Sequence, residues 1–300
     1  MWNIVRYRVI YFLLSATLIV SGLVTLYMGS GLSLSIEFTG GAAIRAEFNT
    51  DVSQVEVETV IDEMGYENYV VQGFGDGEFF IRLPLSNDAV GQENQVRSGL
   101  EKLSTLSMNF DQVSPSIASE TIRNALIAVL VAVVGILLYI IYAFRGVQHS
   151  FRYGICAVIA LAHDILMAFA VAGVVTTFAS NVIRLEISSM FLVGVLTLLG
   201  YSINDTIVVF DRIRENLLRE THRTLSDTVN FSILESMGRS INTSFTTLLV
   251  LLALLLVGPV SIFDFIFVMI VGVVSGTYSS IFVASQVLVY WDERRSQAIG

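Results

Sequence analysis

Long stretches without a charged residue alternate with short charged segments along this chain of 300 residues. Four stretches contain no Asp, Glu, Lys or Arg: residues 9–36, 124–144, 240–263 and 265–291. Two more contain a single acid each, which is Asp164 in 153–183 and Asp205 in 187–210. Because a membrane-spanning helix needs about 20 apolar residues, the pattern predicts six spanning helices. Their expected ranges are 10–29, 124–144, 153–175, 187–210, 241–258 and 265–290.

The composition is that of an integral membrane protein, with 54% hydrophobic residues, 14% charged residues and a mean hydropathy of +0.71. Arginines orient the helices, because basic residues are enriched in cytoplasmic segments. They cluster at Arg6 and Arg8, Arg145 and Arg152, Arg212 to Arg223, and Arg294 and Arg295. Both termini are then cytoplasmic. The expected domains are a first helix with the N-terminus (1–30), an external domain (31–120), a five-helix domain (121–292) with a cytoplasmic loop (211–239), and a tail (293–300).

The external segment has the pattern of a small α+β domain. Alternation predicts four strands, at Ala42–Phe48, Tyr69–Phe74, Glu78–Leu83 and Met108–Val113. A helix capped by Asp51 is expected to run to about Met64, and a second helix is expected over Asp88–Leu103. Gly75-Asp76-Gly77 predicts a hairpin turn between the two middle strands. The order βαββαβ matches a split-βαβ, ferredoxin-like domain.

Charge is unevenly distributed, because 15 acids and only four bases lie between Glu37 and Glu120. This acidity argues against a nucleic-acid partner, which needs a basic face. The segment shows neither a nucleophile with its base nor a His, Cys and carboxylate cluster with metal-ligand spacing. We therefore expect no enzyme activity, no metal and no cofactor, and we interpret the domain as a contact surface.

Two short tethers connect this domain to the helices. Glu37-Phe38-Thr39-Gly40-Gly41 follows the first helix, and Val113-Ser114-Pro115-Ser116 precedes the second. The double glycine predicts a turn with positive φ. A phosphate-binding loop is disfavoured, because a strand follows the glycines instead of a helix N-terminus.

Three polar sites interrupt the apolar helices. His163-Asp164 lies midway along the third helix and Asn204-Asp205 near the end of the fourth. The fifth helix begins at Arg239, and Asn242, Thr243, Thr246 and Thr247 are expected to continue one face of it. Because the fourth and fifth helices run in opposite directions, Asp205 and Arg239 lie at similar depth. An ion pair between them is predicted.

Small residues indicate that the polar groups face inward. Ala157, Ala160, Asp164, Ala168 and Ala172 share one side of the third helix, and Gly194, Thr197 and Tyr201 are expected on the Asp205 side of the fourth. Two interpretations stay open, a buried clamp that holds helices together and a path for protons or ions. His163 is either part of this relay or a hydrogen-bonded spacer.

Five segments resemble those of SecF, a family of bacterial protein-export membrane subunits. They are Gly200-Tyr201-Ser202-Ile203-Asn204-Asp205-Thr206, Phe210-Asp211-Arg212-Ile213-Arg214-Glu215-Asn216, Ala162-His163-Asp164, Asn242-Thr243-Ser244 and Glu37-Phe38-Thr39-Gly40-Gly41. The resemblance covers nearly the whole chain in order. Two positions depart from the family, with Glu37 where Asp is usual and Gly238-Arg239-Ser240 in place of a His-Arg-Thr context.

The resemblance implies a multi-pass protein of the bacterial cytoplasmic membrane, within the resistance-nodulation-division superfamily. Its implied partners are SecD, the SecYEG channel with a YajC-like accessory subunit, the lipid bilayer and the unfolded polypeptide being translocated. It implies that the proton-motive force drives export. Asp205 and Arg239 match the family's functional aspartate and arginine, and Asp164 matches its third-helix aspartate.

Three other functions are considered. A half-transporter of the same superfamily would export small molecules or lipids. An intramembrane aspartyl protease would need Asp164 and Asp205 within hydrogen-bond range, and the sequence before Asp205 lacks Gly-x-Gly-Asp. A passive scaffold would keep its activity after the three polar sites are neutralised.

Overall fold

The structure is a computed structural model that describes residues 3–28, 32–49, 52–74, 77–86, 88–147, 149–179, 185–219, 222 and 224–299. The chain divides into two compact units, which are described separately. Unit 1 comprises residues 1–32, 127–179 and 189–300, and unit 2 comprises residues 33–126 and 180–188.

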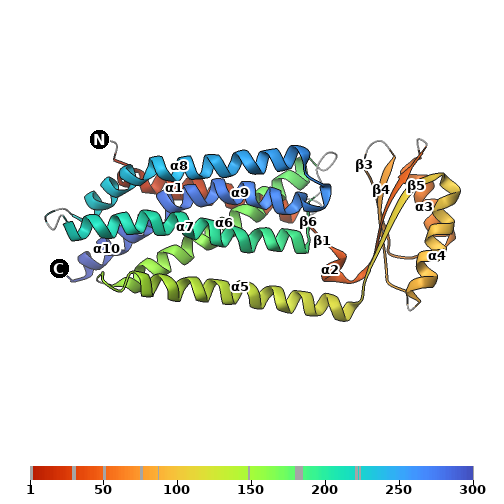
Figure 1. The fold of residues 1–300 in the computed structure, drawn as a ribbon, viewed down its shortest axis with the longest axis horizontal. Helices are drawn as coiled ribbons and strands as arrows, with labels where there is room; N and C mark the ends of the chain where they lie inside the picture. Colours follow the sequence, from red (N-terminus) through yellow and green to blue (C-terminus); the bar gives the residue numbers. More distant parts are fainter. Residues whose placement is uncertain are drawn as a thin grey trace. The chain divides into compact units, whose positions relative to one another are not determined.

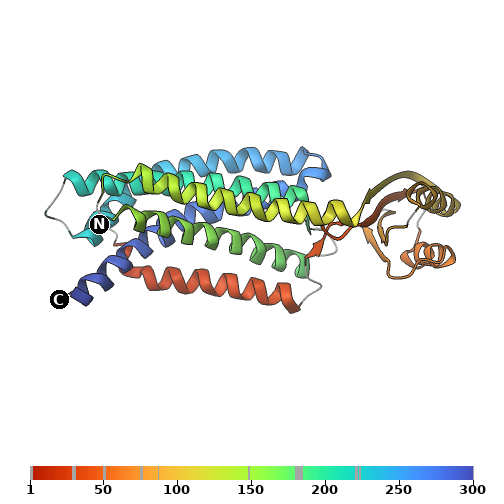
Figure 2. The same ribbon diagram turned by 90° about the horizontal axis from the view of Figure 1, so that it is seen from below.

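Long helices make up unit 1 and lie side by side (Figures 1 and 2). Their bounds are α1 Arg8–Met28, α5 Pro115–Ala143 (in this unit from residue 127), α6 Ser150–Phe178, α7 Ser189–Arg219, α8 Leu225–Val257, α9 Phe263–Ser279 and α10 Ser285–Ile299. The short 3-10 helices η1 (Val5–Tyr7) and η3 (Val260–Ile262) precede α1 and α9. A π-helical turn, η4 (Ser280–Ala284), joins α9 to α10.

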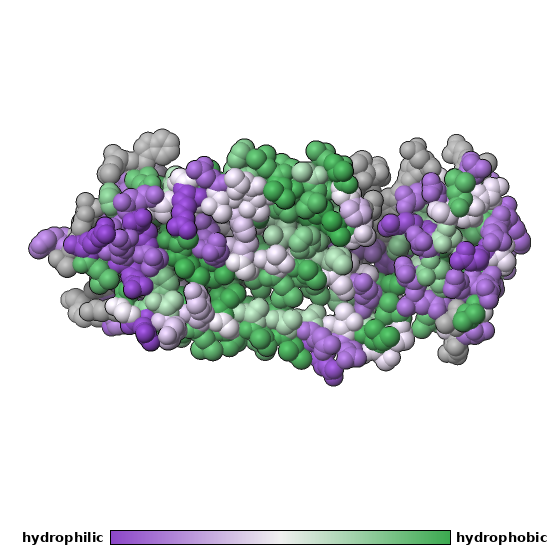
Figure 3. Space-filling model, viewed as in Figure 1, coloured by the Kyte–Doolittle hydropathy of each residue, from purple (hydrophilic) through white to green (hydrophobic). Residues whose placement is uncertain are grey.

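The six predicted spans are confirmed as helices, because the described residues contain six helices long and apolar enough to cross a membrane. Hydrophobic side chains cover the middle of these helices, and hydrophilic ones gather at the end of unit 1 that holds both termini (Figure 3). The helices are longer than hydropathy predicts, since α7 and α8 continue beyond their apolar parts to Arg219 and from Leu225.

Unit 2 contains a four-stranded antiparallel sheet in the order β3-β4-β2-β5. The strands are β2 Gly41–Phe48, β3 Val70–Phe74, β4 Glu78–Leu83 and β5 Thr105–Val113, and the helices are α2 Ile36–Thr39, α3 Gln54–Glu63, α4 Ala89–Leu100 and η2 Glu101–Leu103. Helices α3 and α4 cover one face of the sheet (Figure 1). Val57, Ile61, Val96 and Leu100 from these helices pack on Ile44 and Ile81.

The start of α3 differs from the sequence prediction. Ser53 is the N-cap, and it forms a capping box in which its side chain accepts from the Glu56 N–H and the Glu56 carboxylate accepts from the Ser53 N–H. The backbone hydrogen bond from Ser53 lowers the pKa of Glu56. Asp51, the predicted cap, and Gly75 and Asp76 of the predicted turn lie outside the described residues.

A second, two-stranded parallel sheet pairs β1 (Ser33–Leu34) with β6 (Glu186–Ile187). Arg82 of β4 connects the two sheets, because its guanidinium donates to the Leu34 carbonyl at 2.8 Å and lies 3.1 Å from Glu186. The predicted positive-φ turn is confirmed, with φ of 71° at Gly40 and 122° at Gly41. The second tether differs from the prediction, since Pro115 is the first residue of α5.

One contact in unit 2 makes a tyrosine unusually weakly acidic. The Tyr69 phenol donates to Asp62 at 2.7 Å, and this hydrogen bond to a carboxylate raises the pKa of Tyr69 to about 12. The bond therefore stabilises the folded unit fully below the ordinary tyrosine pKa of 10.0 and is lost as the pH rises toward 12.

We expect Asp62→Asn to return the ionisation of Tyr69 toward pH 10, because the favoured acceptor loses its charge. The measurement is the tyrosinate absorbance of the full chain as a function of pH, with a Tyr69→Phe variant subtracted. Glu63→Gln removes a neighbouring negative charge without touching that hydrogen bond and serves as the control. An unchanged titration in Asp62→Asn contradicts the assignment.

Candidate functional site

Asp164 of α6 is fully buried and surrounded by hydroxyl groups from two other helices. Its carboxylate accepts hydrogen bonds from Ser202 of α7 at 2.6 Å and from Ser275 and Ser279 of α9 at 2.5 and 2.7 Å. His163 Nδ1 lies 3.0 Å from the same carboxylate. An ionised carboxylate can accept about four hydrogen bonds, so these four groups occupy its capacity.

Asp205 of α7 has a similar but smaller shell. It is 8% exposed and accepts hydrogen bonds from Ser240 of α8 and Ser280 of η4, both at 2.5 Å. Hydrogen bonds to an ionised group contribute about 1.5–3 kcal/mol each, and their loss inside an apolar region leaves the charge unsatisfied. The two carboxylates are therefore held by five serine hydroxyls from four elements, α7, α8, α9 and η4.

Helix periodicity explains which serine faces which carboxylate. Ser275 and Ser279 are four residues apart on α9 and face the same way, toward Asp164. Ser280 is turned by one residue and faces Asp205 instead. On α7, Ser202 and Asp205 are three residues apart, so this helix contributes one donor and one carboxylate to the same interior.

Glycines bring α7 and α9 close enough for these contacts. A Cβ on Gly276 would lie 3.0 Å from the Ser202 Cβ, and a Cβ on Gly272 would lie 2.4 Å from the end of Leu198. A Cβ on Gly194 of α7 would lie 2.9 Å from Val268. Small residues at four-residue spacing are typical of close helix packing in membranes.

His163 extends this polar region toward α1. Its ring stacks on Tyr278 with the ring centroids 6.0 Å apart, and Tyr278 donates to the Tyr11 carbonyl at 3.0 Å. Ser15 of α1 donates to the Tyr278 oxygen at 3.2 Å. His163 Nε2 is buried and has no hydrogen-bond partner among the described residues.

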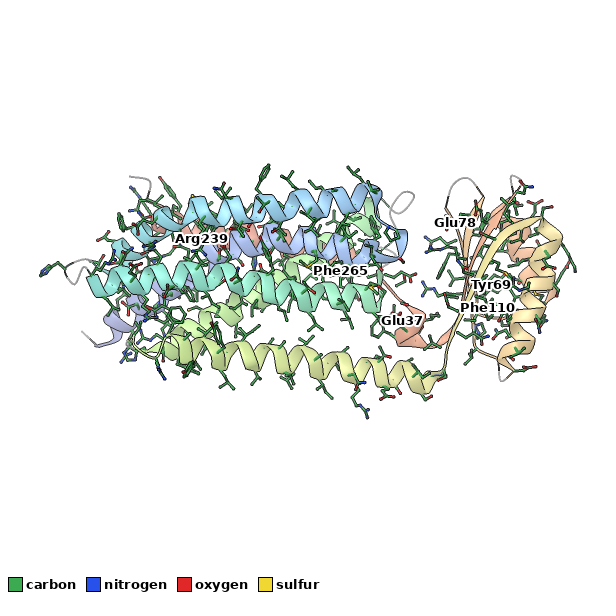
Figure 4. The ribbon with its side chains drawn as sticks, viewed as in Figure 1. Glu37, Tyr69, Glu78, Phe110, Arg239 and Phe265 are labelled. Atoms are coloured by element: carbon green, nitrogen blue, oxygen red, sulfur yellow. The ribbon has the colours of Figure 1, made fainter. Side chains whose placement is uncertain are left out.

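The predicted ion pair between Asp205 and Arg239 is absent, since no contact within 4.0 Å joins these two described residues. The Arg239 side chain is exposed on α8 (Figure 4), and the next residue, Ser240, takes the place beside Asp205. Successive helix residues point about 100° apart, so equal depth did not imply a shared face.

The other polar residues predicted to face inward lie on the outside of unit 1. Asn204 and Thr197 of α7 are exposed. So are Asn242, Thr243 and Thr246 of α8, while Thr247 is half-buried. We call the exposed residues Asn204, Arg239, Asn242, Thr243 and Thr246 the polar stripe.

The predicted inward direction of the small side of α6 is confirmed. The small side of α6 is buried at Ala157, Ala160, Ala168 and Ala172. Tyr201 donates to Ser244 at 3.2 Å, and Ser244 is hydrogen-bonded to Thr277 of α9.

The serine hydroxyls were not predicted as partners of the acids. Two signals in the sequence mark Ser275 and Ser279 of α9, their four-residue spacing and their position three residues after Gly272 and Gly276, respectively.

The predicted tether residues lie in unit 2. Ser35 caps the short helix α2, which contains Glu37, Phe38 and Thr39, and Phe38 is buried. A Cβ on Gly40 would lie 3.3 Å from Pro115 Cα, so the two tethers are adjacent. Among the described residues, no group of three or more His, Cys, Asp or Glu side chains could hold a metal ion.

Long apolar helices with buried, hydrogen-bonded carboxylates, together with a separate α+β unit, define a polytopic membrane protein of the transport type. The comparisons with known proteins agree. A family model described as "Protein export membrane protein SecD/SecF, C-terminal" matches residues 93–294. The chain belongs to the SecD/SecF family.

Its relatives include proteins named SecF and longer proteins named SecDF. The chain is 37% identical to the protein translocase subunit SecF of Thermobaculum terrenum, with 98% of this chain and 95% of the relative covered. It is 34% identical to SecF of Anaerolinea thermophila, with 97% and 94% covered. The crystal structure of Thermus thermophilus SecDF has a TM-score of 0.80 and 32% identity over 98% of this chain and 40% of that chain.

We expect Gly276→Val to destabilise unit 1 by about 1–3 kcal/mol, because overpacking at the closest approach of α9 to Ser202 separates α7 from α9. Gly200→Val is the matched control, since a Cβ there meets no atom within 4 Å. The measurement is the free energy of unfolding of the two variants in detergent. Equal stability of both variants contradicts the close packing.

Proposed function

We propose that this chain is an auxiliary subunit of the Sec protein translocase, which together with SecD uses the proton-motive force to promote polypeptide export. The relatives named SecF, matched over almost their whole length, support the role in protein translocation. The single observation that supports gradient coupling is the buried pair of carboxylates, each held by hydroxyl groups that can respond to its protonation. The proposed role is not enzymatic.

The proposed partner is SecD. This chain covers only 37% and 38% of the SecDF proteins of Thermus thermophilus and Bacillus subtilis, so those proteins carry a further part joined to the SecF-like part. The polar stripe supports a protein partner, because its arginine and asparagine side chains would be costly against lipid, at about 2.5–3.5 kcal/mol for an Arg at a helix centre. SecD covers the stripe in our proposal.

The orientation follows from the arginines, with both termini cytoplasmic in the cytoplasmic membrane of a bacterium. Unit 2 is the external domain, and its strand and helix order supports a ferredoxin-like fold. The outer domain would contact the unfolded polypeptide, while SecYEG and a YajC-like subunit complete the assembly.

Protonation of Asp205 is the proposed coupling step. A neutral carboxyl holds Ser240 and Ser280 less strongly than a carboxylate, so α7, α8 and the α9–η4 junction rearrange. The change reaches the outer domain through Glu37-Phe38-Thr39-Gly40-Gly41 and through Pro115 at the start of α5. Voltage assists, since one charge crossing the membrane releases about 2.3 kcal/mol per 100 mV.

We expect Asp205→Asn to abolish the gradient-dependent part of export, because the side chain can no longer gain or lose a proton. The measurement is precursor translocation into inverted vesicles from a strain depleted of its own SecF, with and without a proton gradient. Asp211→Asn is the matched control, as it removes an exposed acid from the same helix. Full gradient-dependent export in Asp205→Asn contradicts the proposal, and altered resistance to small toxic molecules without precursor accumulation favours the small-molecule exporter.

A second prediction concerns the partner. The only cysteine, Cys156, is buried and can be replaced, so single cysteines can be introduced. We expect Asn242→Cys to form crosslinks to SecD in membranes. Leu130→Cys, on an exposed position of α5, serves as the control and should react with no SecD cysteine. Crosslinking from position 130 but not from 242 contradicts the proposed interface.

A further inference from the structure

We propose that the adjacent hydroxyls of Ser279 and Ser280 couple the protonation of Asp164 to that of Asp205, through the junction between α9 and the π-helical turn η4. The inference rests on the proposed function, because it names the residues through which the two carboxylates of that function affect each other.

Ser279 and Ser280 are neighbours in the sequence and donate to different carboxylates. Ser279 donates to Asp164 at 2.7 Å and Ser280 donates to Asp205 at 2.5 Å, and both serines are fully buried. The two carboxylates belong to different helices, α6 and α7, and a single peptide bond joins the two donors. A movement of one donor therefore displaces the other.

Each of these two hydroxyls also has a backbone carbonyl within hydrogen-bond distance as an alternative acceptor. Ser279 Oγ lies 3.2 Å from the Gly276 carbonyl, and Ser280 Oγ lies 3.0 Å from the Thr277 carbonyl. A serine hydroxyl has one proton to donate, so it serves either the carboxylate or the carbonyl at full strength. Each serine can therefore adopt two hydrogen-bonded arrangements.

Protonation selects between these arrangements without breaking a covalent bond in the serine. The incoming proton binds a carboxylate oxygen and forms a carboxyl O–H. That O–H donates to the serine oxygen, and the serine hydroxyl turns its own proton to the backbone carbonyl one turn earlier. The reverse sequence returns the proton and restores the hydrogen bond to the carboxylate.

The backbone that follows Ser279 departs from a regular α-helix. The π-helical turn begins at Ser280, and π-helical turns inside α-helices are frequent at functional sites. Its carbonyls are bonded by buried side chains, with Ser285 donating to the Ser280 carbonyl at 2.8 Å and Gln286 donating to the Ile281 carbonyl at 3.2 Å. The junction can therefore adjust its backbone bonding while these two carbonyls keep a side-chain donor.

Few other ionisable groups surround this region. His163 faces Asp164 from α6, Tyr278 of α9 stacks on His163, and Tyr11 of α1 lies behind Tyr278. Arg239 of α8 is exposed and makes no contact within 4.0 Å with Asp205. None of these groups contacts both carboxylates, whereas the Ser279–Ser280 pair does.

The test is an infrared titration of the full chain in lipid vesicles, which follows the carboxyl C=O band of each aspartate. Bands are assigned by their loss in Asp164→Asn and Asp205→Asn. We expect Ser279→Ala to shift the pH midpoint of Asp205 by about half a pH unit or more, although this hydroxyl touches only Asp164. Ser280→Ala should shift the midpoint of Asp164 in the same way.

Ser236→Ala is the matched control, because this buried serine of α8 donates only to carbonyls of its own helix and should shift neither midpoint. The proposal is overturned if each variant shifts only the carboxyl that its hydroxyl touches, or if neither carboxyl titrates in the pH range where the chain stays folded. The titration needs no export. If neither serine variant shifts the midpoint of the aspartate that it does not touch, while export still responds to the gradient, this inference alone is refuted. If those midpoints shift but export does not respond to the gradient, the proposed function alone is refuted.

Discussion

A carboxylate between apolar helices is stable only when hydrogen-bond donors surround it, and this requirement determines how unit 1 is built. Asp164 takes donors from α7 and α9, so these helices must approach α6 at one level. That approach requires glycine, because a side chain at Gly276 would collide with Ser202. The buried charge and the close packing therefore depend on each other.

Much of the fold could be predicted, because hydropathy sums over about 20 residues and tolerates local exceptions. The strands of unit 2 could be predicted from alternation for the same reason. Helix ends depend on single residues, so they are harder to predict from the sequence. Asp51 and Ser53 are both good caps by residue type, and only the reciprocal bond with Glu56 selects Ser53. Pro115 starts α5 inside a polar segment that hydropathy cannot recognise as helix.

The sequence predicts which acids form the site, but it does not predict which residues donate hydrogen bonds to them. Asp164 and Asp205 are conspicuous because charge is rare in apolar helices, whereas serine is unremarkable there. Arg239 was paired with Asp205 from depth alone, and depth fixes position along a helix without fixing direction around it. One residue of rotation places Ser240 inside and Arg239 outside. To predict which residues of two helices meet, one needs both the position along each helix and the direction around it. The prediction for Arg239 used only the position.

Because Arg239 points outward, the polar residues of the membrane-spanning helices divide into an inner set around the two carboxylates and the outer polar stripe. Asp164 has four hydrogen-bond partners within this chain and Asp205 has two. The polar stripe on α7 and α8, by contrast, has an arginine and two asparagines facing outward from membrane-spanning helices. A lone chain in lipid would carry the cost of that stripe, so the stripe requires a protein surface or water against it. Asp205 lies inside this chain beside its serine donors, whereas Arg239 lies on the surface that a partner would cover. In the proposed function, gradient coupling therefore depends on the assembly, because the partner completes the surroundings of Arg239.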